Sequence, residues 1–204
     1  MTEKNEDELT KIVGDKVIPE LVKVALTPSA EELGKGLVTI ARTINLALEP
    51  LAGVIWGYEK IKAHVIEGLV KRFADKPESI IKPRLNVVGP LIESMKFTAQ
   101  EETLREMYIN LLASSMDAEN VNGVHPSYVE VIRQLTADEA KIISFLPTIH
   151  LYPIVSTSMS FGEMQYDEVA RDFRNICKGA GVEYLDQSPQ YLDNLRRLLL
   201  LEFR

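Results

Sequence analysis

The sequence is poor in the side chains that build metal sites, disulfides and nucleophilic centres. Its 204 residues include one cysteine and three histidines. One cysteine excludes a disulfide within the chain, and the histidines, at positions 64, 125 and 150, show no HExxH or paired-cysteine spacing typical of a metal site. The GxxxxGK[ST], GxSxG and GxGxxG patterns are also missing. We therefore expect no catalytic residues, no cofactor and no metal, and a protein that is not an enzyme.

Basic charge is also scarce. The chain has 23 Lys and Arg against 30 Asp and Glu, a formal net charge of −7. Residues 98–140 contain two basic and eight acidic side chains, net −6, whereas residues 58–84 contain seven basic and four acidic ones, net +3. Nucleic-acid binding needs clustered Lys and Arg to neutralise phosphates, so this distribution argues against it. The basic segment is interpreted as one solvated helix face.

The N-terminal residues lack the apolar core of a signal peptide, because the chain starts Met-Thr-Glu-Lys. Apolar residues make up 46% and charged residues 26% of the chain, which is typical of a soluble globular protein. The sequence therefore predicts a cytoplasmic protein.

What the sequence does contain is helical periodicity. Thr98 with Glu101, and Thr136 with Glu139, have the S/T-x-x-E spacing of a capping box and predict two helix starts. Apolar stripes at helical spacing predict helices on either side of the Asn122-Gly123 turn. The stripe positions are Val54, Tyr58, Ile61, Val65, Leu69 and Phe73, then Leu104, Met107, Tyr108, Leu111 and Leu112, then Tyr128, Val131, Ile132 and Leu135.

These patterns predict a mainly α, multi-helix array in three parts. Residues 1–96 form an N-terminal region of long amphipathic helices, including one over 80–95 that is kinked or broken at Gly89-Pro90. Residues 97–146 form a central helical core. Residues 147–204 contain a β-branched strand candidate at 150–158 and helices over 166–178 and 188–198. This order resembles a winged-helix module that is incomplete at residue 204, so we expect the chain to be a fragment.

An apolar run at 37–57 permits two interpretations. It is about as long as the roughly 20 residues that cross a bilayer, but Arg42, Glu49 and Pro50 interrupt it, which favours a buried soluble helix over a membrane segment. Gly53 and Gly57 form a GxxxG, which permits close helix packing or self-association.

Few polar residues stand out. His125 precedes Pro126 at a predicted helix entry, where its ring could serve exposed backbone groups. Cys177 lies on an apolar helix face and predicts an inert core thiol. Arg196 and Arg197, on the last helix, are the candidate nucleic-acid contacts of the winged-helix-like part.

Three strings carry a resemblance to a known family. They are LREMYINLLASSMD at 104–117, VHPSYVEVIRQLTADEAKIISFL at 124–146 and YLDNLRRL at 191–198. They resemble the abortive-infection alpha family, prokaryotic proteins linked to phage resistance, although Leu199 stands where such sequences commonly have Gly. The family offers no established catalytic residues. Asn110, His125, Pro126 and Asp138 match its pattern, and each has a structural interpretation.

The resemblance implies antiviral defence. Together with the lack of a catalytic constellation, it leads us to expect action by binding another macromolecule, such as an unknown protein or a phage component, or by self-assembly into a homo-oligomer. The alternatives are membrane perturbation through residues 37–57 and nucleic-acid binding through the C-terminal part. For Asn110 we expect a partly buried amide that bonds to the His125-Pro126 turn, because a buried amide without partners costs about 1–3 kcal/mol.

Overall fold

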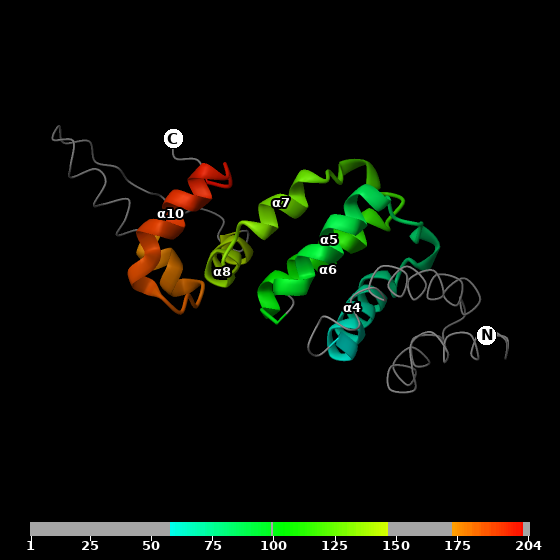
Figure 1. The fold of residues 1–204 in the computed structure, drawn as a ribbon, viewed down its shortest axis with the longest axis horizontal. Coiled ribbons are helices and arrows are strands. Elements are labelled where there is room, and N and C mark those ends of the chain that lie inside the picture. The colour runs from blue at the N-terminus through cyan, green and yellow to red at the C-terminus, as the bar shows by residue number, and fades with distance from the viewer. Residues whose placement is uncertain (1–57, 99, 147–172, 202–204) are drawn as a thin grey trace. The chain divides into compact units, whose positions relative to one another are not determined.

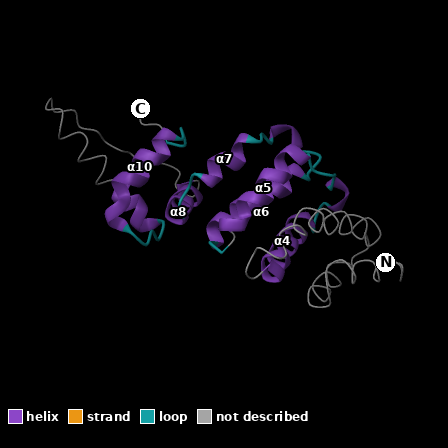
Figure 2. Ribbon diagram, in the orientation of Figure 1, coloured by secondary structure: helices purple, strands orange, loops and turns teal. Residues whose placement is uncertain are grey.

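The computed structural model describes residues 58–98, 100–146 and 173–201. These residues are mainly α-helical, as the sequence predicts, and strand-type pairing among them is limited to one antiparallel bridge between Ile80 and Asp117 (Figures 1 and 2). They divide into two compact units, one ending at Arg133 and the other beginning at Gln134. The predicted boundary between residues 96 and 97 falls inside a helix.

The first unit is built around one central helix, α6. Its helices are α4 (Tyr58–Phe73), α5 (Leu85–Thr98), α6 (Glu102–Ser115) and α7 (Ser127–Arg133), with 3₁₀ turns η2 (Pro77–Ser79) and η3 (Val121–Gly123). Helix α6 contacts α4, α5 and α7 (Figure 1). It buries Tyr108, Ile109 and Leu112 completely. Because α6 is apolar on several sides, it can be covered by three helices at once.

Helix α5 begins and ends later than its sequence suggests. Residues 80–84 are not helical, and the helix continues through Pro90 to Thr98. The Thr98 hydroxyl donates to the Ser94 carbonyl at 3.1 Å, so it does not cap the next helix. Glu101 is the N-cap of α6 and makes no side-chain cap bond. The capping box predicted for Thr98 and Glu101 is therefore wrong, because Thr98 belongs to the preceding helix.

The stripe predicted for α7 is wrong at Tyr128, which is exposed with its ring at the edge of His125, whereas Val129 is completely buried. Ile132 packs against the core and Leu135 is buried, as the stripe predicts. The helix is only two turns long, so the few apolar positions allowed more than one choice of buried face.

The second unit contains α8 (Ala137–Phe145), a helical segment over 173–179, η5 (Leu185–Gln187) and α10 (Ser188–Arg197). Thr136 and Glu139 form the predicted capping box at the start of α8. Phe173, Ile176 and Cys177 are buried, as their spacing predicts. The segment 173–179 ends in a Schellman turn, in which Val182 N–H donates to Cys177 C=O and Gly181 has φ +70°.

Several predictions concern residues outside the described part of the chain. The strand candidate at 150–158, the apolar run at 37–57 and the Gly53 and Gly57 pair all lie there. The winged-helix interpretation therefore stays a prediction. Among the described helices, none combines the length and the apolar character needed to cross a bilayer.

Helix α10 ends in a second Schellman turn that contains a leucine in the glycine position. Leu200 N–H donates to Leu195 C=O, Leu199 N–H donates to Arg196 C=O, and Leu199 has φ +56°. A Cβ in this left-handed conformation costs about 1–2 kcal/mol. The Leu199 side chain is 89% exposed, so little burial offsets that cost. A glycine adopts this conformation without the Cβ cost.

We predict that Leu199→Gly stabilises the second unit by about 0.5–1 kcal/mol, the relief of strain less the extra chain entropy of glycine. Urea unfolding measures the change. Leu199→Ala is the matched control, because alanine keeps the Cβ and should change stability by less than about 0.5 kcal/mol. An equal gain from both variants would show that loss of the exposed side chain, not backbone strain, is responsible.

Candidate functional site

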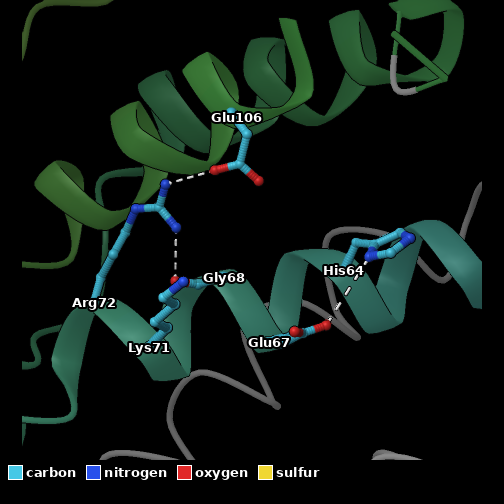
Figure 3. Close-up of a pocket in the computed structure, with 6 residues that line it drawn as sticks. All are labelled: His64, Glu67, Gly68, Lys71, Arg72 and Glu106. Atoms are coloured by element: carbon cyan, nitrogen blue, oxygen red, sulfur yellow. Dashed lines mark hydrogen bonds and ion pairs between the residues drawn. The ribbon is translucent and has the colours of Figure 1, made fainter. Parts of the chain in front are cut away.

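An open groove between α4 and α6 is the candidate site of the first unit. It has a volume of about 520 Å³ (Figure 3). The lining is almost entirely ionisable and consists of His64, Glu67, Gly68, Lys71, Arg72 and Glu106. The α4 residues recur at spacings of three and four and so share one helix face. This α4 wall belongs to the basic segment 58–84, and the opposite wall is acidic.

Gly68 lets the two walls approach closely. A Cβ placed on Gly68 would lie 2.9 Å from Cγ2 of Ile109, closer than side chains pack without a shift. The two helices run in the same direction, because Gly68 lies against Ile109 and, further along, Lys76 bonds to Asp117. The parallel course brings the N-terminal halves of α4 and α6 together at one end of the groove.

Arg72 joins the two walls. Its Nε donates to Oδ1 of Asn110 at 2.7 Å and its Nη2 donates to Oε2 of Glu106 at 2.8 Å. Its Nη1 donates to the Gly68 carbonyl at 2.8 Å (Figure 3). Three bonds in different directions fix the plane of the guanidinium at one end of the groove.

The prediction for Asn110 is wrong. Its side chain is exposed, and its partner is Arg72 rather than the turn at His125 and Pro126. The apolar neighbours Leu111 and Leu112 suggested burial, but Asn110 lies on the side of α6 that faces the groove rim. The amide therefore orients an arginine that the sequence did not single out.

Asp117 and Lys76 join the chain just beyond the C-terminal ends of α6 and α4. The carboxylate is 4% exposed and accepts from Lys76 Nζ at 2.5 Å, Asn120 Nδ2 at 2.6 Å and Glu119 N–H at 3.1 Å. Burial opposes its ionisation, but these donors outweigh burial and lower the pKa of Asp117. Sequence reasoning missed this role, because the Lys76 partner lies 41 residues away.

Asp138 organises the second unit. It is 5% exposed, and its Oδ1 accepts from Glu183 N–H at 3.0 Å and Lys141 Nζ at 2.8 Å. Its Oδ2 accepts from Tyr184 N–H and from the Tyr191 hydroxyl, both at 3.1 Å. Burial alone would raise the pKa of Asp138, but the four donors lower it to about 2. Burial and the nearby carboxylate raise the pKa of Tyr191 to about 12.

A second contact between α8 and α10 lies next to Asp138. Asn194 Nδ2 donates to Glu139 Oε1 at 2.8 Å and to the Gln134 carbonyl at 3.1 Å. Arg197 Nη1 donates to Gln134 Oε1 at 3.0 Å. Arg197, a candidate nucleic-acid contact, is therefore engaged within the unit, and Arg196 is exposed on the same helix.

The remaining polar candidates also have structural contacts. His125 Nδ1 accepts from Ser127 N–H at 3.1 Å and lies 2.7 Å from the Ser127 hydroxyl, at the entrance of α7. Cys177 is completely buried, and burial raises the pKa of its thiol. The described residues contain no cluster of three or more His, Cys, Asp or Glu side chains placed to hold a metal ion.

The comparison with protein families identifies the chain. The family model described as abortive infection alpha matches residues 58–204, more than half of the chain. The protein belongs to the abortive infection alpha family. No curated protein and no solved structure is similar enough to the chain to count as a match.

In this abortive infection alpha protein, two of the strings that carry the resemblance bind each other. The QLTADEA stretch at 134–140 supplies Asp138 and Glu139, and the YLDNLRRL stretch at 191–198 supplies Tyr191 and Asn194. The third string supplies Asn110, which holds Arg72. These polar residues of the pattern therefore contribute to packing and orientation.

We predict that removing Asn110 uncouples Arg72 from α6. Asn110→Ala, measured by urea unfolding in the wild-type and Arg72→Met backgrounds, should give a coupling energy of about 0.5–1 kcal/mol, the range of a hydrogen bond near the surface. A coupling energy of zero would mean that the amide does not orient the guanidinium.

We predict that Asp138→Asn destabilises the second unit by about 2–4 kcal/mol at pH 7, because an amide cannot accept from all four donors and leaves some of them buried without a partner. Asp193→Asn, at an exposed position of α10, is the matched control and should change stability by less than about 0.5 kcal/mol.

The same variant tests the pH dependence. The pKa of Asp138 is lowered from 3.8 to about 2 in the folded protein. The ionised carboxylate therefore stabilises the fold by about 2 kcal/mol. This stabilisation is present above about pH 4 and is lost as the pH falls toward 2. The stability difference between wild type and Asp138→Asn should therefore shrink over that window. A difference that stays constant from pH 6 to pH 2 would contradict the proposed role.

Proposed function

We propose that this protein is an abortive-infection phage-defence protein that acts by binding a macromolecule or by self-assembly rather than by catalysis. The family supports the defence role. The observation that supports the binding mechanism is the α4–α6 groove, an open, charged surface rather than an enclosed cavity around a reactive group (Figure 3).

The buried ionisable groups do not favour catalysis. Asp117 and Asp138 each accept several hydrogen bonds that hold them ionised, so neither carboxylate is available to exchange a proton near neutral pH. The Cys177 thiol is buried and its pKa is raised, which disfavours the nucleophilic thiolate.

The exposed charges of the groove favour binding. Lys71 is exposed and makes no ion pair with a described residue, and Glu67 is 62% exposed with only the His64 ring nearby, at 4.0 Å. Exposed charges of this kind can select a partner and accelerate the encounter with it.

We predict that expression of the full chain lowers phage plaque formation and that Lys71→Glu abolishes this protection while the protein remains folded by circular dichroism. Reversal of the charge converts an attractive contact with the partner into a repulsive one. The measurement is the efficiency of plating over a broad phage panel.

Lys178→Glu, at an exposed position of the second unit, is the matched control and should protect as wild type does. Full protection by Lys71→Glu would exclude the groove as the binding surface. No protection by the wild-type chain against any phage of the panel would contradict the defence role itself.

A further inference from the structure

The charges of the α4–α6 groove are arranged along its length. Lys71 and Arg72 lie in the last turn of α4, and Glu67 lies one turn earlier. On α6, Glu106 pairs with Arg72, whose guanidinium also donates to the Gly68 carbonyl beside Glu67. The groove therefore presents Glu67 and, one turn later, Lys71, with the His64 ring one turn before Glu67.

Part of this charge is not compensated by the described residues of the unit. Arg72 uses Nε, Nη1 and Nη2 in bonds to Asn110, Gly68 and Glu106. In contrast, the exposed side chain of Lys71 pairs with no described residue, and Glu67 is 62% exposed with the His64 ring at 4.0 Å. A partner that matches the groove in charge therefore places an acid against Lys71 and a base against Glu67.

This requirement favours one kind of partner. A nucleic acid presents only negative charge, which Glu67 would repel. A second copy of the same groove, turned by a two-fold axis, places its Glu67 on Lys71 of the first copy and its Lys71 on Glu67 of the first copy. Each contact then occurs twice.

We propose that the α4–α6 groove is the two-fold interface of a homodimer in which Lys71 of each copy faces Glu67 of the other. The proposal rests on the self-assembly part of the proposed function and names its surface and its partner. The second copy supplies an acid to Lys71, which pairs with no described residue of its own unit.

The test uses charge reversal in the full chain, with mass measured by sedimentation equilibrium at low salt. Wild type should form a dimer that weakens as salt is raised, because the contacts are screened. Lys71→Glu leaves only acids at 67 and 71, and Glu67→Lys leaves only bases. Each variant alone should dimerise at least about tenfold more weakly than wild type, since like charges now meet across the axis.

The decisive experiment mixes the two variants. Lys71→Glu carries acids at 67 and 71, and Glu67→Lys carries bases there, so the mixture should form a one-to-one heterodimer in which both contacts are restored. Lys178→Glu, outside the groove, should dimerise as wild type does. Circular dichroism checks that every variant is folded.

Three results would overturn the proposal. They are a wild-type chain that stays monomeric at about 100 μM and low salt, single variants that dimerise as wild type does, and a mixture that does not associate. A monomer that still protects cells from phage would reject the dimer while leaving the defence function intact.

Discussion

A buried carboxylate persists in a folded protein only when hydrogen-bond donors surround it, and this constraint shapes both units. In the second unit, Asp138 collects donors from α8, from the turn before η5 and from α10. In the first unit, Asp117 collects them from the segment after α4 and from its own loop. Each aspartate therefore joins segments that are distant in the sequence. Because each buried carboxylate must keep its hydrogen-bond donors, it fixes the register of the helices that carry them.

Several polar residues of the resembling strings are used within the fold. Asp138, Glu139 and Asn194 join segments of the second unit. Asn110 orients Arg72 at the groove. Of the groove charges, Glu67, Lys71 and Arg72 lie outside the strings, whereas Glu106 lies within the first of them.

Local sequence patterns predicted what depends on neighbouring residues. The Thr136 capping box and the buried face of the segment 173–179 were predicted because their partners lie within a few positions. The Thr98 box failed because the same four residues fit the end of α5 as well as the start of α6. The groove could not be predicted, since it depends on which residue of α6 lies against Gly68, and that register is set by packing between helices. The αL conformation of Leu199 was signalled only by the glycine common in resembling sequences.

The most direct test of the account is an NMR titration of the side-chain carboxyl carbon of Asp138 in the folded chain. Four donors around a buried carboxylate predict a midpoint near a pKa of about 2, well below the ordinary value of 3.8. A midpoint at or above 3.8 would mean that the donors do not hold the charge. The claim that Asp138 is a structural centre, rather than a group free to react, would then be contradicted.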